Sequence, residues 1–199
     1  SLKDSTNQFT WEKTFHSLKK ISSEIKKFVE KGDRCLLISE NRPEWFISDL
    51  SIMLSGAITV PSYTTYSERD YEYIIDDCNP KLIFVSNQEQ YNKVKEIINE
   101  KGFIKKIFSF ENLDLDQNKY ININNLISKL DLTDETIPKL DLRRNNPTCI
   151  IYTSGTQGNP KGVILSHGGI LNNCEGALEI LKPLLTNQTR FLTWLPLSH

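Results

Sequence analysis

Residues 149–167 read CIIYTSGTQGNPKGVILSH, and in this stretch two apolar, β-branched runs flank a polar centre. The centre carries three hydroxyl side chains, three glycines and Lys161. Glycine lets a backbone approach a bulky anion closely and turns successive N–H groups the same way. The hydroxyls and the Lys161 ammonium add hydrogen-bond donors. The stretch therefore predicts a strand, a polyphosphate-binding loop and a second strand.

The spacing differs from that of the common phosphate loop of nucleoside triphosphatases. In that motif a Ser or Thr follows the lysine, and a helix begins at once. Here Pro160 precedes Lys161, Gly162 follows it, and the next residues alternate like a strand. A helix dipole is therefore not the main source of positive potential in this loop. The alternative is a glycine-rich hairpin turn without a ligand, and the hydroxyls crowded beside one lysine favour the phosphate site.

The composition limits the classes of partner. The chain has 199 residues, of which 38% are hydrophobic and 25% charged, as in a soluble globular protein. A net charge of −1 argues against a nucleic-acid partner held by bulk electrostatics. No run reaches the roughly 18 apolar residues that a membrane helix needs. The four cysteines are far apart without a C-x-x-C pair, and three lie within apolar or helical patterns, which predicts buried free thiols in a reducing compartment and no zinc or other metal site.

Strand-like and helix-like segments alternate over residues 34–130. The predicted strands are 35–38, 58–60, 81–85 and 105–110, and the predicted helices are 43–54, 67–78, 87–102 and 124–130. This alternation predicts an α/β fold with a parallel sheet and helices on both faces, whose ligands bind beyond the carboxyl ends of the strands. Residues 111–147 lack a clear period and are interpreted as a surface excursion. After the loop, Ser166 is predicted to cap a helix over 169–182, and a last strand is predicted over 190–197.

Residues 152–162, YTSGTQGNPKG, resemble the signature loop of the adenylate-forming superfamily, which includes acyl-CoA synthetases, luciferases and peptide-synthetase adenylation domains. The resemblance covers essentially the whole chain. The segments ENRPEW at 40–45, GAITVP at 56–61 and LPLSH at 195–199 are similar to the long-chain fatty acyl-CoA synthetase branch. Gln157 departs from the pattern, because the family usually has Thr or another small residue there. A glutamine amide can still donate a hydrogen bond to phosphate.

The resemblance implies a reaction and a set of site residues. The parent enzyme would join a fatty acid to Mg-ATP as an acyl-adenylate, release pyrophosphate and pass the acyl group to coenzyme A. The partners implied are therefore small molecules, namely fatty acid, ATP and coenzyme A, with Mg²⁺ as the metal. His199 matches a position that lines the acyl and adenylate site, with a plain terminal residue as the alternative. The residues that match the ATP-phosphate loop are Thr153, Ser154, Gly155, Thr156, Gln157, Gly158 and Lys161.

The resemblance also implies an incomplete enzyme. The adenine-binding segment, the aspartate that holds ribose and the C-terminal domain with its catalytic lysine have no counterpart in this chain. We therefore expect an N-terminal fragment, inactive alone, from an enzyme of the cytoplasm or the cytosolic face of a membrane. Another carboxylate-adenylating enzyme, such as an aryl-CoA ligase or a peptide-synthetase adenylation domain, stays an alternative. A non-catalytic relative also stays an alternative. His167, which follows the loop, is expected to be structural, at the start of a helix.

Three regions are predicted from the same resemblance. Residues 34–188 form the sheet subdomain that carries the loop at 152–162. Residues 1–33, with a helix over 10–31, and residues 189–199 belong to an incomplete second subdomain. The apolar side chains of these two segments are expected to lack their native partners, namely Trp11, Phe15, Leu18, Phe191, Trp194 and Leu195.

Overall fold

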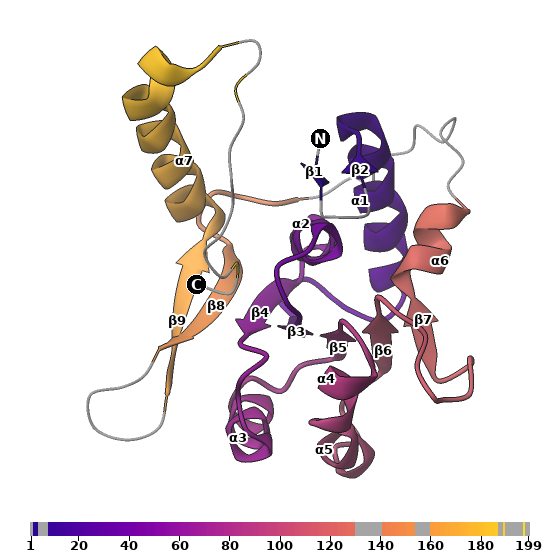
Figure 1. Cartoon of the computed structure of the whole chain (residues 1–199). Helices are drawn as coiled ribbons and strands as arrows, with labels where there is room; N and C mark the ends of the chain where they lie inside the picture. Colours follow the sequence, from indigo (N-terminus) through magenta and orange to yellow (C-terminus); the bar gives the residue numbers. More distant parts are fainter. Residues whose placement is uncertain are drawn as a thin grey trace.

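The computed structural model describes residues 2–3, 8–129, 141–153, 160–186, 189 and 197. A seven-stranded sheet organises most of them (Figure 1). Its strands are β3 (Arg34–Ile38), β4 (Ile58–Ser62), β5 (Leu82–Val85), β6 (Lys106–Ser109), β7 (Tyr120–Asn122), β8 (Pro147–Thr153) and β9 (Lys161–Ser166). Their order is β7-β6-β5-β3-β4-β8-β9, and every neighbouring pair is parallel except β8 and β9. A separate antiparallel ladder joins β1 (Leu2–Lys3) to β2 (Gln8–Phe9).

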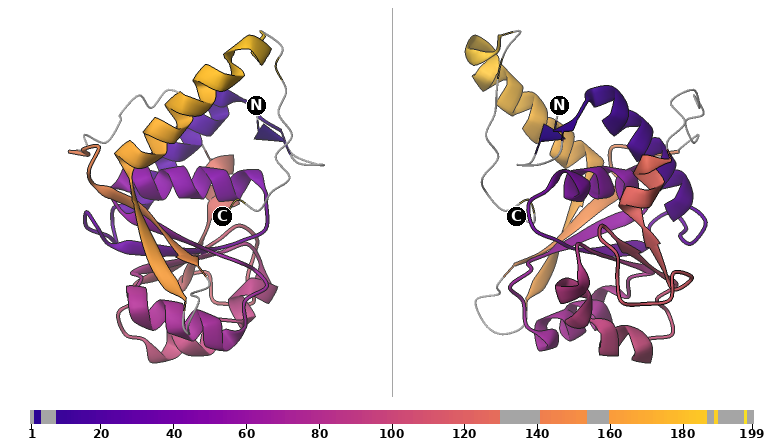
Figure 2. Two further views of the ribbon diagram at one scale, coloured as in Figure 1. Left: turned by 90° about the vertical axis from the view of Figure 1, so that its left-hand side faces the viewer. Right: turned by 45° about the vertical axis from the view of Figure 1, so that its right-hand side comes forward.

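Helices cover both faces of the sheet, as Figure 2 shows. One face carries α1 (Trp11–Ile25), α2 (Pro43–Ser55) and α6 (Ile123–Ser128), and the other carries α3 (Glu68–Cys78), α4 (Gln88–Asn92) and α5 (Lys95–Glu100). Successive residues of β3 alternate between the two cores: Cys35 and Leu37 face the first, whereas Leu36 and Ile38 face the second. A strand buried on both faces reads as a continuous apolar run. The predicted α/β fold with a parallel sheet is confirmed.

Local sequence signals set several helix ends. Ser67 and Asp70 form the predicted capping box of α3, in which each side chain bonds the other residue's main-chain N–H. Gly56 ends α2 with φ 89°, a conformation that glycine adopts without steric cost. Asn87 begins α4 by accepting a hydrogen bond from the Gln90 N–H. The single helix predicted over 87–102 is wrong, because the chain breaks between α4 and α5 and buries Val94 in the second core.

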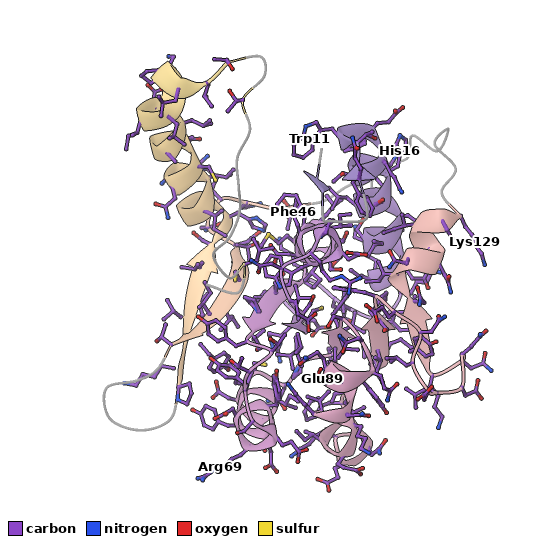
Figure 3. All side chains as sticks on the ribbon, in the orientation of Figure 1. Trp11, His16, Phe46, Arg69, Glu89 and Lys129 are labelled. Atoms are coloured by element: carbon purple, nitrogen blue, oxygen red, sulfur yellow. The ribbon has the colours of Figure 1, made fainter. Side chains whose placement is uncertain are left out.

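The predicted helix over 10–31 ends at Ile25, and it packs on the sheet. Ile21 and Ile25 are fully buried in the first core, and Leu18 packs against that core, which contradicts the expectation that Leu18 lacks a partner. Trp11, labelled in Figure 3, is 65% exposed, and Phe15 is 49% exposed, so neither side chain is buried by the described residues. The helix therefore buries one face along most of its length, from Thr14 to Ile25, and its large buried apolar side chains lie in the C-terminal half.

The three-region division stays a prediction. Much of the last region lies outside the described residues, and so do its three apolar side chains, Phe191, Trp194 and Leu195. Leu197 is described, and it packs against the first core. The first region contacts the sheet subdomain through α1, which lies beside α2 and α6.

Among the described residues of the segment 111–147, β7 is a strand that the sequence pattern did not reveal. β7 extends the sheet by pairing in parallel with β6, and Tyr120 buries its ring in the second core. The Tyr120 hydroxyl accepts a hydrogen bond from the Leu113 N–H. A three-residue strand is too short to show a period of two within a polar segment. The short helix predicted at 124–130 is present as α6.

The last described helix projects from the sheet. α7 (His167–Leu181) begins at Ser166, whose hydroxyl accepts the Gly169 N–H as predicted, and the 3-10 turn η1 (Lys182–Leu184) follows it. Figure 1 shows α7 extending away from the other helices. Leu178 and Ile180 on α7 are 55% and 79% exposed. None of the described helices is long and apolar enough to cross a membrane.

Asp49 on α2 predicts a pH dependence of stability. Among the described residues its Oδ1 atom is buried without a hydrogen-bond partner. Burial raises the pKa of this carboxyl to about 6, although a hydrogen bond with Thr59 opposes the rise. The folded pKa exceeds the unfolded value of about 4, so the free energy of unfolding should fall as pH rises from 4 through 6. The loss from this residue should be roughly 3 kcal/mol.

Urea denaturation of the protein and its Asp49→Asn variant between pH 4 and pH 8 measures this effect. The variant should be the more stable one at pH 7, and the difference between the two proteins should shrink toward pH 4. Equal pH profiles would contradict the assignment.

Candidate phosphate-binding loop

The β8–β9 hairpin carries the predicted loop at the carboxyl edge of the sheet. β8 runs parallel to β4, with Thr59 opposite Cys149, so its carboxyl end lies at the same edge as those of the other parallel strands. β9 returns antiparallel to β8. The two strands predicted on either side of the loop are therefore confirmed, and the loop itself, at 154–159, lies outside the described residues. Ligands of parallel α/β sheets bind at this edge.

Two of the predicted site residues face each other at the mouth of the loop. Thr153 is the last residue of β8 and Lys161 the first of β9, and they are direct partners in the ladder. Both are exposed, and no described residue forms an ion pair with Lys161. The mouth of the loop thus presents a hydroxyl and an ammonium to solvent, which suits an anion.

The remaining predicted site residues lie outside the described residues. They are Ser154, Gly155, Thr156, Gln157, Gly158 and His199. Their roles in ATP and adenylate binding stay predictions. The described part of the chain contributes the two strand ends that flank the loop.

Gly162 lets the hairpin strands approach closely next to the loop. It lies opposite Tyr152 in the ladder. A methyl group on Gly162 would lie 2.8 Å from Ile150 Cγ2 and 3.3 Å from Tyr152 Cζ. Tyr152 is 5% exposed. Because Gly162 has no side chain, the Ile150 and Tyr152 side chains of β8 can pack against its backbone.

Replacing Gly162 by alanine should destabilise the protein by about 1–3 kcal/mol, because the added methyl group overpacks the Ile150 and Tyr152 side chains. Urea denaturation measures the change. Gly176→Ala on α7 is the matched control, because a methyl group there meets nothing within 4 Å. That control should be neutral or stabilise by up to about 1 kcal/mol. A neutral Gly162→Ala variant would contradict the close packing.

Tyr152 also has a polar partner. Its hydroxyl donates to Asp77 Oδ2 at 2.5 Å. Burial and this hydrogen bond raise the pKa of Tyr152 above its usual range, so the ring stays neutral. This hydrogen bond joins β8, the strand before the loop, to α3.

His167 occupies the first turn of α7 rather than the loop. Its main-chain N–H donates to the Asn146 carbonyl at 3.1 Å, and burial lowers the pKa of its imidazole. This position agrees with the structural role expected for it.

A partly buried ion-pair network lies at the turn after β3, and sequence reasoning did not identify it. Arg42 donates to both carboxylate oxygens of Glu44, at 3.0 Å and 3.2 Å, and to Glu111 Oε1 at 2.8 Å. Asn124 donates to Glu44 Oε1 at 3.2 Å. Next to this network, Asn41 Oδ1 accepts the Leu197 N–H at 2.9 Å. The sequence signal was the pair of charged residues on either side of Pro43, whereas their further partners Glu111 and Asn124 are distant in sequence.

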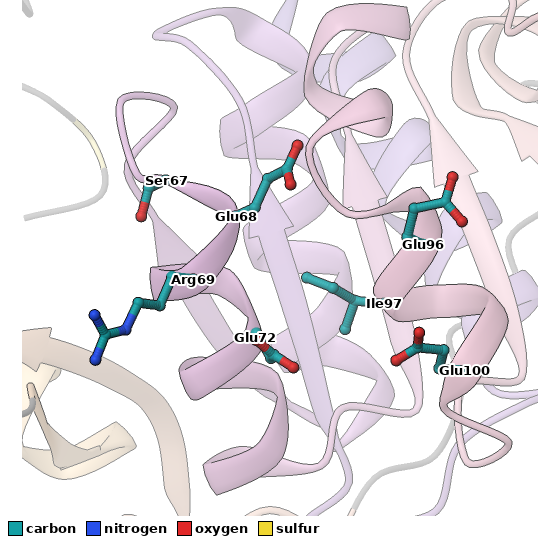
Figure 4. Close-up of a pocket in the computed structure, with 7 residues that line it drawn as sticks. All are labelled: Ser67, Glu68, Arg69, Glu72, Glu96, Ile97 and Glu100. Atoms are coloured by element: carbon teal, nitrogen blue, oxygen red, sulfur yellow. The ribbon is translucent and has the colours of Figure 1, made fainter.

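The groove between α3 and α5 does not suit a polyphosphate. Figure 4 shows the side chains of Glu68 and Glu72 on α3 across from Glu96 and Glu100 on α5. Four carboxylates repel an anion. The loop mouth is therefore the better candidate for an ATP site.

The cysteines are free thiols. Cys35, Cys78 and Cys149 are buried and Cys174 is exposed. Burial raises the pKa of Cys78 and of Cys149 to about 12, so these thiols stay protonated at neutral pH. The described residues contain no cluster of His, Cys, Asp or Glu that could hold a metal ion.

Known proteins are similar in sequence to this chain over most of its length. The AMP-binding enzyme family matches residues 1–199. A long-chain-fatty-acid–CoA ligase of Mycobacterium tuberculosis is 29% identical over 171 residues, covering 86% of this chain and 28% of that protein. A long chain acyl-CoA synthetase of Arabidopsis thaliana is 30% identical over 200 residues, covering 96% of this chain and 30% of that protein.

The fold is also shared with solved structures. The acetoacetyl-CoA synthetase of Streptomyces lividans has a TM-score of 0.80 at 17% identity, covering 97% of this chain and 31% of that one. At this identity the likeness concerns the fold alone. The chain spans less than a third of the length of the two curated relatives above. Because the family matches the whole sequence, the chain belongs to the AMP-binding enzyme family.

Proposed function

We propose that this chain is the N-terminal part of a long-chain fatty acid–CoA ligase. One observation carries the proposal: Thr153 and Lys161 lie opposite each other, exposed, at the mouth of a glycine-rich loop on the carboxyl edge of the sheet. The curated relatives in the preceding subsection, which are named as long-chain ligases and synthetases, support the acyl class.

The proposed reaction has two steps. A carboxylate oxygen of the fatty acid attacks the α-phosphorus of ATP, and the bond to the oxygen that bridges to the β-phosphate breaks. Pyrophosphate leaves with that oxygen, and the acyl-adenylate remains. The thiol of coenzyme A then attacks the acyl carbonyl, loses its proton and displaces AMP.

The chain's own residues would act on the leaving group. Negative charge builds on the pyrophosphate oxygens as the bond breaks, and donors already in place stabilise it. Lys161 supplies a full positive charge there, and Thr153 supplies a hydroxyl donor. Mg²⁺, carried in on the phosphates, would neutralise further charge.

ATP–pyrophosphate exchange on the full-length ligase tests the proposal. A panel of fatty, aromatic and amino acids, each assayed with and without coenzyme A, separates the candidates. Exchange that depends on a long-chain fatty acid, with acyl-CoA as the product, is expected. Exchange with aromatic or amino acids would favour an aryl-CoA ligase or an adenylation domain instead. No exchange with any acid would favour a non-catalytic relative. The reason to consider that alternative is Gln157, which departs from the family's loop pattern.

Residues 1–199 alone should not form an acyl-adenylate, so added hydroxylamine should yield no hydroxamate. The resemblance places the adenine, ribose and catalytic-lysine contacts elsewhere, and each orients a group that the reaction needs. Hydroxamate formed by this segment would contradict the proposed division of the site.

We also propose that the ligase works in the cytosol or on the cytosolic face of a membrane. The buried free thiols of Cys35, Cys78 and Cys149 support a reducing compartment. Fractionation of cells that express the full-length protein tests this placement.

A further inference from the structure

α3 contacts both flanks of the phosphate loop. On the entering side, the Tyr152 hydroxyl donates to Asp77 Oδ2 at 2.5 Å. On the leaving side, the Tyr73 hydroxyl donates to the Pro160 carbonyl oxygen at 3.1 Å. In Figure 1, α3 lies near the end of β8 and the start of β9. One helix therefore bonds the chain just before the loop and again just after it.

The spacing on α3 suits this double contact. Tyr73 and Asp77 are four residues apart, so their side chains lie on the same face of the helix, one turn apart. The two bonds enclose residues 153–159, the predicted phosphate loop. The neighbouring Asp76 lines the same hollow as Tyr73 and Pro160, but its carboxylate pairs with Lys101 at 2.6 Å rather than with the hairpin.

α3 is fixed against the sheet by buried side chains, and hydrogen bonds hold both of its ends. Tyr71, Ile74 and Ile75 are fully buried in the second core. The capping box described above fixes the first turn. At the other end, Arg34 Nε donates to the Cys78 carbonyl oxygen at 2.6 Å. Movement of α3 relative to the sheet would break these contacts, so the two bonds to the hairpin tie the loop to a rigid support.

We propose that Tyr73 and Asp77 are positioning residues that hold the two flanks of the loop, so that Lys161 and Thr153 face the polyphosphate of ATP. The proposal rests on the proposed function for its ligand and on the two hydrogen bonds for its geometry. A loop whose ends are already fixed loses less conformational freedom when it binds an anion. Losing either bond therefore weakens ATP binding without removing a group that touches ATP.

The test uses Tyr73→Phe, Asp77→Ala and the double variant in the full-length ligase. Each single variant should raise KM for ATP about three- to tenfold, which is the effect of losing one hydrogen bond. KM for the fatty acid should change less than twofold. Asp77→Asn keeps an acceptor oxygen and should recover part of the loss. Asp76→Ala is the matched control: it removes a carboxylate from the same helix but no bond to the hairpin, and it should leave KM for ATP unchanged.

A second measurement does not depend on activity. Hydrogen–deuterium exchange should become faster at the amides of residues 153–159 in Tyr73→Phe and Asp77→Ala, with α3 and the sheet protected as in the wild type. If the wild type shows no ATP–pyrophosphate exchange, the proposed function fails, and the deuterium result still decides the loop attachment. Unchanged loop exchange would overturn the inference. So would faster exchange throughout the domain, because the two residues would then only stabilise the fold.

Discussion

Lys161→Ala in the full-length ligase should lower the rate of adenylation, or the affinity for ATP, by about ten- to a hundredfold. The ammonium is exposed at the loop mouth, has no carboxylate partner among the described residues, and lies opposite Thr153. A hydrogen bond to a charged group contributes roughly 1.5–3 kcal/mol, and each 1.4 kcal/mol is a factor of ten. ATP–pyrophosphate exchange at several ATP concentrations measures the change.

Three further measurements give this result its meaning. Hydrolysis of supplied acyl-adenylate should be less affected by Lys161→Ala, because no pyrophosphate leaves in that reaction. Lys161→Arg keeps the charge and should retain part of the activity. Lys129→Ala removes an exposed lysine after α6 (Figure 3) and should change nothing. Unchanged kinetics in Lys161→Ala would mean that the loop is only a turn.

Arg42→Met should reduce the free energy of unfolding by about 3–5 kcal/mol. The Glu44 side chain is 1% exposed, and Arg42 contacts both of its carboxylate oxygens. Removing the guanidinium leaves a buried carboxylate without a counter-charge, and that loss is the largest effect expected of an ion pair. Urea denaturation of the variant and the wild type at pH 7 measures it.

Two comparisons identify the cause of that loss. Lys27→Met removes one partner of the more exposed pair with Glu24 and should cost less than about 1 kcal/mol. Arg42→Met combined with Glu44→Leu removes both charges and should recover much of the stability, because no buried carboxylate remains. If Arg42→Met lowers the free energy of unfolding no more than Lys27→Met does, the Arg42–Glu44 pair behaves as a surface ion pair.

The sequence by itself determined the features that short-range chemistry encodes. Apolar runs such as 35–38 and 82–85 marked strands buried on both faces, and their alternation with helices required a parallel sheet. Ser67 with Asp70 marked the start of α3, and Gly56 marked the end of α2. The two strands that flank the glycine-rich stretch followed in the same way. In each case residues within a few positions of one another carry the information, so one sequence suffices to identify it.

The tertiary structure alone decided which distant residues meet. Tyr152 reaches Asp77, Tyr73 reaches Pro160, and Arg42 reaches Glu111 only because the strand order places their elements side by side. The same order decides that Ile21 and Ile25 of α1 are buried while Trp11 is exposed, and that the short β7 has a partner in β6. Local pattern cannot specify these contacts, since the free energy that selects them comes from packing between segments far apart in the chain.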